Sequence, residues 1–269
     1  MMKKLILLNL VSFICSFNFS YGQEKLEVEG AIIIRNSEDP TPAPGTIRFN
    51  SSNSDFEGWN GLFWATLTGF RLGSVTDIDN NTYKTVTIGS QEWMAENLRV
   101  SKYRNGDPLP NVTNDTDWGN LGSGAYCWYN NDSNYEQPYG KLYNWYALTD
   151  SRGLCPSGWS EPTDTQWTTL TDFLGGLAVA GGLLKEEGTT HWITNSSGAT
   201  NESGFTALPG GERLATGNSA FLLNIAYFWS STESGGTGAY NRRIYRTTDS
   251  VQRENKDKKL GYSVRCVRD

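Results

Sequence analysis

The sequence predicts a mixed α+β fold in which strands dominate. Aromatic residues make up 13% of the chain and Gly contributes 29 residues, and short runs rich in aromatic and β-branched residues are separated by Gly, Asn, Ser and Pro. This composition is typical of a β-rich exported protein. Clear helical periodicity is confined to residues 163–174. The 269-residue chain is long enough for one large domain or two smaller ones.

The chain begins with the pattern of an export signal. Lys3 and Lys4 precede an apolar run over residues 5–19, and small residues follow at a signal-peptidase site. The run is too short and too interrupted to predict a membrane span. Cys15 is preceded by an isoleucine, which disfavours lipidation. We therefore expect a signal peptide over residues 1–22, no membrane span after its removal, and an exported protein that is extracellular, at the cell surface or periplasmic.

A small β-rich module is expected over residues 23–72. Strand-like runs occur at residues 31–35, 45–50 and 63–67, separated by prolines and by turn residues in "NSSNSD" and "GWNG". So short a unit buries little core alone. The pattern "PGTIRFN" followed by "DFEGW" resembles short modules of phage tail fibres and surface adhesins, which implies a stalk that joins copies of the chain into a homo-oligomer, often a trimer. The alternative is a β-hairpin that packs on the main domain.

The main domain is expected over residues 75–269 and opens with a hairpin. The turn is "DIDNN", and residues 82–88 alternate as a strand. Asp77, Asp79 and Asn81 also match the first half of a calcium loop, but the twelfth position is Ile88 where a bidentate Glu is needed, so a turn is favoured. Residues 141–148 are expected in the core, and four strands close the chain: 226–231, 239–246, 250–253 and 261–268.

The single helix is predicted by its start signal and its apolar face. Thr163 is an N-cap and Gln166 completes a capping box. The apolar face consists of Trp167, Leu170, Phe173 and Leu174, and Gly175-Gly176 ends the helix. Cys155 lies about eight residues before the helix start, so no helix dipole activates it as a nucleophile.

One loop combines aromatic rings with amides and a carboxylate. The candidate ligand-binding residues are Trp128, Tyr129, Asn131, Asp132 and Tyr135. Such side chains stack on sugar rings and hydrogen-bond to their hydroxyls. The alternative is a polar loop with a few packed aromatics.

Composition and motifs argue against several other functions. A net charge of −6 with no basic patch argues against nucleic-acid binding. His191 is the only histidine, which excludes HExxH zinc sites, and no GxSxG motif is present. A His between a threonine and a tryptophan, as here, is more often a packed or solvated residue than a catalytic one. We expect no catalytic residue, no metal and no cofactor.

Three cysteines remain after the signal peptide: Cys127, Cys155 and Cys266. An oxidising compartment should pair two of them, and the count leaves all three pairings open.

Residues 75–269 closely resemble the Fibrobacter succinogenes major paralogous domain family. The resemblance runs in order through "DIDNNTYKTVTIGSQEWMAENLR", "GAYCWYNND", "YGKLYNWYAL", "GLCPSGWSEPTDTQW", "GATNESGFTALPGG", "FWSSTE" and "YSVRCVRD". It implies a relative of the C-type-lectin-like fold, in which the chain around "CPSGW" meets the C-terminal strand. That placement implies a disulfide between Cys155 and Cys266 and an unpaired Cys127. The calcium-ligand motifs of sugar-binding C-type lectins are absent in the expected order, so calcium-dependent binding is not implied.

These observations favour a non-enzymatic binding or adhesion module whose partner is a glycan or another cell-surface ligand. A purely structural extracellular unit is the first alternative. A polysaccharide-acting enzyme is the second, with Glu96, Asp132, Glu202 and Glu233 as its candidate carboxylates.

Overall fold

The computed structural model describes residues 42–50, 55–59, 64–66, 72–194 and 197–269. The expected signal peptide, Cys15 and the expected strand at residues 31–35 lie outside these ranges. None of the helices within the described ranges is long and apolar enough to cross a bilayer.

Five sheets and several short helices make up the described part of the chain, so the architecture is mixed and rich in strands. The largest sheet has the order β4-β5-β6-β15-β9, and the pairs in it are antiparallel. Its strands are β4 Leu72–Thr76, β5 Thr82–Ile88, β6 Gln91–Met94, β9 Trp159–Ser160 and β15 Val267–Arg268.

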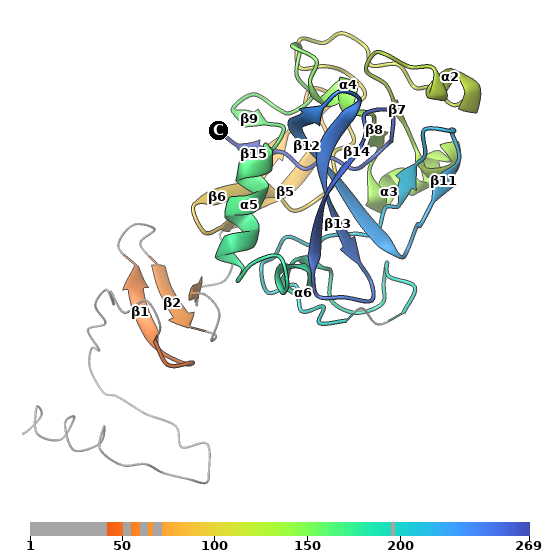
Figure 1. Cartoon of the computed structure of the whole chain (residues 1–269). Helices are drawn as coiled ribbons and strands as arrows, with labels where there is room; N and C mark the ends of the chain where they lie inside the picture. The colour runs from red at the N-terminus through yellow and green to blue at the C-terminus, as the bar shows by residue number, and fades with distance from the viewer. Residues whose placement is uncertain (1–41, 51–54, 60–63, 67–71, 195–196) are drawn as a thin grey trace, which may run out of the picture.

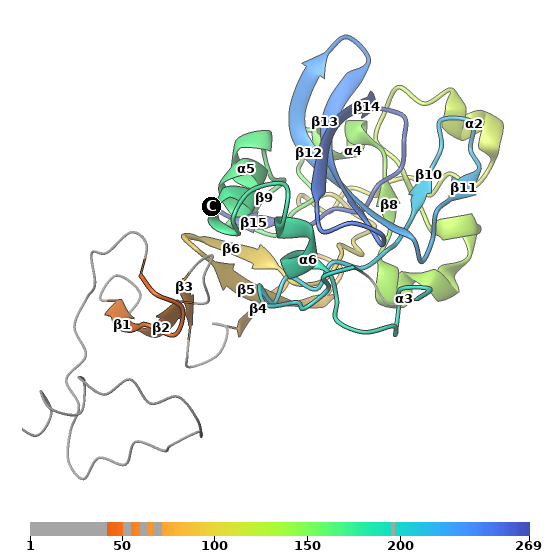
Figure 2. The same cartoon turned by 60° about the horizontal axis from the view of Figure 1, so that its bottom comes forward.

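A second antiparallel sheet consists of β12 Ile225–Gly235, β13 Gly238–Tyr245 and β14 Val251–Asp257. Two short ladders pair β7 Tyr126–Cys127 with β8 Leu142–Tyr143, and β10 Glu212–Arg213 with β11 Ser219–Ala220. Within the described ranges the α-helices are α2 Asp115–Gly119, α3 Glu136–Tyr139, α4 Trp145–Leu148, α5 Asp164–Phe173 and α6 Ala180–Leu184. The two ladders, α2 and α3 gather at the end of the domain away from β4, β5 and β6 (Figures 1 and 2).

The C-terminal strand β15 lies inside the largest sheet, between β6 and β9. Val267 pairs with Trp93 of β6 on one side and with Ser160 of β9 on the other. The Asp269 amide then donates to the Gly158 carbonyl at 3.1 Å. The chain end therefore lies next to β9, as Figure 1 shows. This confirms that the "CPSGW" segment meets the C-terminal strand.

Cys155 and Cys266 form a disulfide, with their Cα atoms 5.8 Å apart, and Cys127 is buried and free. The pairing implied by the family resemblance is confirmed. Cys155 precedes β9 and Cys266 precedes β15, so the bond reinforces the contact between these two strands.

The first hairpin of the domain is held by one aspartate. The Asp77 side chain accepts hydrogen bonds from the backbone amides of Asp79 and Asn81, both at 2.9 Å, and from the Tyr83 hydroxyl at 2.6 Å. Asn80 adopts the left-handed conformation with φ of 65°. The expected turn is confirmed, and the Asp77 carboxylate is occupied by hydrogen bonds from the turn and from Tyr83.

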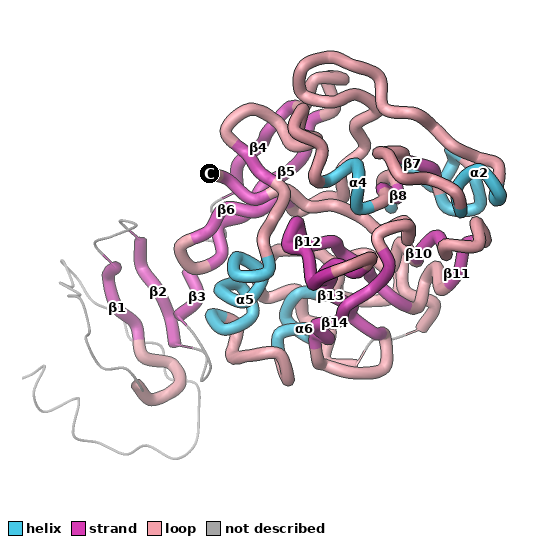
Figure 3. Tube along the Cα trace, turned by 45° about the horizontal axis from the view of Figure 1, so that its top comes forward, coloured by secondary structure: helices cyan, strands magenta, loops and turns pink. Residues whose placement is uncertain are grey.

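Helix α5 begins with the predicted capping box. The Thr163 side chain accepts from the Gln166 amide, and the Gln166 side chain accepts from the Thr163 amide. Trp167 is fully buried, and its ring centroid lies 4.7 Å from that of Trp93 in β6 and 5.6 Å from that of Phe228 in β12. The helix thus packs on an aromatic core. Figure 3 shows α5 between β6 of the largest sheet and β13 of the second sheet.

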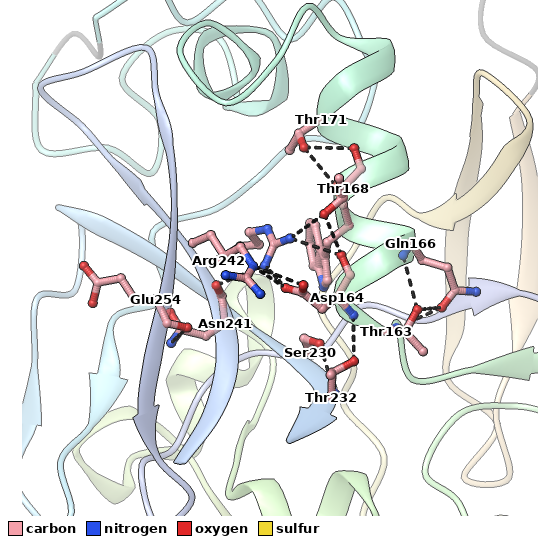
Figure 4. A network of polar contacts seen from close by, with 12 residues as sticks. Thr163, Asp164, Gln166, Thr168, Thr171, Ser230, Thr232, Asn241, Arg242 and Glu254 are labelled. Carbon is pink, nitrogen blue, oxygen red and sulfur yellow. Dashed lines mark hydrogen bonds and ion pairs between the residues drawn. The ribbon is translucent and has the colours of Figure 1, made fainter. Parts of the chain in front are cut away.

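A buried ion pair fastens α5 to the second sheet. Arg242 in β13 donates to Asp164 at 2.7 Å (Figure 4). Arg253 in β14 donates to the same carboxylate at 2.9 Å. The Arg242 side chain is fully buried. Burial raises the pKa of Asp164, but the hydrogen bonds from Arg253 and Arg242 outweigh it and hold that pKa below its usual value.

The last predicted strand is shorter than expected. Only Val267–Arg268 form a strand, whereas Gly261, Tyr262 and Ser263 make single bridges to Arg213, Tyr143 and Phe228 respectively. Residues 261–263 pass β10, β8 and β12 in turn, so they pair with each of these strands at one residue only. An alternating sequence alone does not reveal how many partners a strand has.

The described part of the N-terminal module is a three-stranded antiparallel sheet, β1 Ile47–Asn50, β2 Asp55–Trp59 and β3 Trp64–Thr66. Strands β1 and β3 fall where strands are expected. Strand β2 includes two residues of the expected "GWNG" turn, because pairing with both neighbours favours an extended chain there. Ile47 and Phe56, 48% and 41% exposed, lie on one face.

Candidate functional site

The aromatic loop consists of two 3₁₀ turns, Tyr129–Asn131 and Ser133–Tyr135, that lead into α3. Asn130 and Asn131 have φ of 52° and 57°. Asn tolerates this left-handed conformation better than most residues, which explains why asparagines occupy the bend. The exposed Asp132 side chain accepts from the Asn134 amide at 2.9 Å and so shapes the second turn.

Trp128 belongs to the base of this loop. Its Nε1 donates to Glu136 at 2.7 Å, and its ring packs edge-on against Tyr126 with centroids 5.7 Å apart. The Lys141 ammonium donates to the same Glu136 side chain at 3.0 Å and lies 5.8 Å from the Trp128 ring centroid. The indole N–H and one side of the ring are therefore engaged by the protein.

Asn131 is also held from beneath. Its amide nitrogen donates to the Thr113 carbonyl at 2.9 Å, and its amide oxygen accepts from Arg213 at 3.0 Å. Arg213 is 1% exposed, and its other donors bond to the carbonyls of Val112, Thr113 and Gly217 and to Asp115. Sequence reasoning missed Arg213, because its partners Asn131 and Thr113 lie about 80 to 100 residues earlier in the chain.

Three tyrosines form a row of contacting rings, which we call the tyrosine row: Tyr129, Tyr135 and Tyr139. The centroids of the first pair are 5.5 Å apart, and those of the second pair are 6.3 Å apart. Tyr129 and Tyr135 are partly exposed, whereas Tyr139 is buried. Of the predicted residues, the structure thus brings Tyr129 and Tyr135 together beside the exposed Asp132.

His191 continues the tyrosine row, although no sequence pattern indicated this contact. Its ring lies edge-on to Tyr139, with centroids 5.7 Å apart. Glu186 lies 2.7 Å from its Nδ1, so a neutral imidazole carries its proton on Nδ1 and keeps Nε2 as an acceptor. The histidine is half-buried. Because it lies 52 residues from Tyr139 in the sequence, the contact cannot be predicted from sequence spacing.

Burial sets the ionisation of these rings. It raises the pKa of Tyr139 to about 12, and the nearby charge of Glu186 adds to the effect. Burial likewise raises the pKa of Tyr129, while a hydrogen bond from the Leu222 backbone opposes it. Both phenols are therefore neutral near pH 7 and can donate hydrogen bonds.

The remaining chemical groups are dispersed over the domain. Burial raises the pKa of the Cys127 thiol to about 11, so it is not an activated nucleophile. Glu96 pairs with Arg99 and Glu233 pairs with Lys258 on different elements. Within the described ranges, no cluster of three or more His, Cys, Asp or Glu side chains is arranged to hold a metal.

The model of the Fibrobacter succinogenes major domain matches residues 86–268, which is more than half of the chain. The chain belongs to this family. The match starts within β5 and ends in β15, so it includes the loop, the tyrosine row and the disulfide. No curated protein and no solved structure matches the chain.

Proposed function

We propose that this chain is an exported, non-enzymatic module that binds a glycan at a cell surface or in the extracellular space. One observation carries the proposal: aromatic rings of the tyrosine row meet at a rim that also holds Asp132 and His191. Ring faces stack on the apolar faces of sugars, and carboxylate, imidazole and phenol groups satisfy hydroxyls. Trp128 and Asn131 contribute by holding the loop.

We also propose a C-type-lectin-like arrangement for the main domain. Two observations support it: the C-terminal strand pairs within a sheet formed by the start of the domain, and the disulfide joins the C-terminal segment to the segment just before β9. Such a scaffold holds long loops rigidly at one end, and binding residues are often found on loops of this kind.

The test compares two tyrosine variants of the mature chain on an immobilised glycan array. Tyr135→Ala should weaken retention on the glycans that the unmodified protein binds, because it removes the central ring of the row. Tyr240→Ala is the matched control: Tyr240 is also partly exposed, but it lies in β13 beneath Arg253. Equal retention of both variants, or steady release of sugar from a polysaccharide, would count against the proposal.

We further propose that residues 23–72 join copies of the chain into an oligomer. A single exposed site of this kind gives an affinity of about millimolar, too weak to hold a cell. Linked sites gain roughly 10²–10⁴ in avidity. The exposed Ile47 and Phe56 on one face of the β1–β2 pair support such an association.

Light scattering of the mature chain tests this second proposal. Phe56→Asp should convert an oligomer into a monomer and lower retention on glycan. The control is Ile78→Asp, which adds the same charge at a residue of similar exposure, 46%, in the β4–β5 turn. A monomeric unmodified chain would discard the stalk.

A further inference from the structure

The loop at residues 220–224 has an unusual backbone. Phe221 and Leu223 have φ of 62° and 63°, a left-handed conformation that bulky side chains avoid. Phe221 is nevertheless 52% exposed, so burial of its ring does not compensate for this conformation. Strained residues of this kind gather at functional sites, where the surrounding structure imposes them.

Hydrogen bonds hold this loop firmly in place. The Leu223 amide donates to the Pro209 carbonyl at 2.9 Å, and the Leu223 carbonyl accepts from Ile193 at 3.1 Å. The Phe221 carbonyl accepts from the amides of Asn224 and Ile225 at 3.2 and 3.1 Å. The exposed ring is therefore presented on a fixed backbone.

The loop meets the tyrosine row at one end and the segment that carries His191 at the other. At one end the Leu222 backbone amide donates a hydrogen bond to the Tyr129 hydroxyl. Gly211 permits this approach, since a Cβ there would lie 2.7 Å from the Leu222 nitrogen and 2.9 Å from Cε2 of Tyr129. At the other end Leu223 bonds to Ile193, two residues beyond His191.

These contacts link the tyrosine row, the His191 segment and the 220–224 loop into one closed series of contacts. It runs from Tyr129 through Tyr135 and Tyr139 to His191, and returns through residues 193 and 221–223. Two large apolar side chains are exposed in the second part of this series of contacts: Ile193, 57% exposed, and Phe221. Sequence spacing does not predict it, because its three segments lie far apart in the chain.

We infer that Phe221 forms a second stacking position beside the tyrosine row, and that the ligand is a neutral oligosaccharide long enough to reach both. This inference rests on the proposed glycan-binding function and specifies its ligand. A single terminal sugar covers one ring, whereas a chain of sugars contacts the tyrosine row and Phe221 together.

The charges on the rim favour a neutral ligand over an anionic one. Asp132 is exposed, and Glu186 is half-buried beside His191. The Asp132 carboxylate accepts hydrogen bonds from sugar hydroxyls, and both carboxylates repel uronate or sulfated sugars. Nearby cations are engaged by the protein: Arg246 donates to the Thr194 hydroxyl at 2.6 Å, Arg213 to Asn131 at 3.0 Å and Lys141 to Glu136 at 3.0 Å.

The test measures how binding depends on ligand length. The mature chain is titrated with disaccharides and hexasaccharides of glucan, mannan, xylan and galactan, with oligogalacturonate as the anionic comparison. The unmodified protein should bind a neutral hexasaccharide more tightly than its disaccharide. Phe221→Ala should weaken hexasaccharide binding roughly three- to tenfold and leave disaccharide binding unchanged. Tyr135→Ala should weaken both.

A glycine variant separates binding from folding. Phe221→Gly removes the ring and relieves the left-handed strain, so it should raise the Tm by roughly 2–4 °C while it weakens hexasaccharide binding as alanine does. Leu177→Ala, at an apolar residue 41% exposed elsewhere, is the control and should change neither.

The outcomes distinguish the two proposals. If Tyr135→Ala weakens binding but Phe221→Ala does not, or if both ligand lengths bind equally, the second stacking position is overturned and the glycan-binding function stands. Tighter binding of oligogalacturonate overturns the neutral ligand. If the unmodified protein binds none of these sugars, both proposals fail.

Discussion

Cys155 and Cys266 are joined across 111 residues of sequence, and the bond lies beside the pairing of β9 with β15. The covalent link and the strand pairing thus close the same large loop of the chain. Because β15 is only two residues long, it depends on this reinforcement more than a longer strand would.

Removal of this disulfide should cost much of the stability of the domain. For a loop of this length, the chain-entropy model predicts that Cys155→Ala/Cys266→Ala lowers the free energy of unfolding by about 4–5 kcal/mol. Urea unfolding measures the change. Cys127→Ala is the control, since Cys127 is buried but unpaired. A similar loss in the control would show that buried sulfur, rather than the cross-link, is what matters.

Cys127 should resist alkylation in the folded protein. Burial raises its pKa to about 11, so at pH 8 the thiolate is scarce as well as inaccessible. Mass spectrometry after iodoacetamide treatment should show no label under native conditions and one label in urea without reductant. Labelling of the native protein, or a peptide that links Cys127 to another cysteine, would contradict the disulfide assignment.

Loss of the Asp164 charge should loosen α5 from the second sheet. Asp164→Asn leaves the buried Arg242 without its carboxylate and should lower the free energy of unfolding by about 3 kcal/mol. Asp107→Asn removes an exposed partner of Arg152 and should leave stability unchanged.

The same pair predicts an acid dependence. The folded-state pKa of Asp164 lies below its ordinary value of 3.8, so its contribution is fully present above that value and is lost as the pH falls through the folded pKa. The stability difference between the unmodified protein and Asp164→Asn should therefore shrink below about pH 4. A difference that stays constant down to pH 2 would rule out the charge as its origin.

Buried tyrosines should destabilise the protein in alkali. Burial raises the pKa of Tyr139 and of Tyr103 to about 12, whereas the unfolded chain titrates near 10. Their contribution is complete below pH 10 and is lost as the pH rises through the folded pKa. In an alkaline titration, the absorbance of these phenolates should therefore appear at a higher pH than in the unfolded chain. It should rise abruptly when the protein unfolds. In Tyr139→Phe the delayed part of the titration should be smaller, and an unchanged curve would refute the assignment.

The sequence alone determined those features that short segments encode. The turn at Asp77 and the capping box at Thr163 depend on residues a few positions apart, so local hydrogen bonding suffices to predict them. The ordered phrases of the chain also indicated its family, and through that resemblance the pairing of Cys155 with Cys266.

Only the tertiary structure decided which residues form the surface of the candidate site. Trp128 and Asn131 have the same chemistry as ligand-binding residues, but Glu136 and the distant Arg213 engage their polar groups. His191 and the loop that carries Phe221 contact the tyrosine row across about 50 to 90 residues of sequence. Side-chain chemistry is a property of the residue, whereas exposure and neighbours are set by how distant segments pack. The first can be read along the chain, and the second requires the fold.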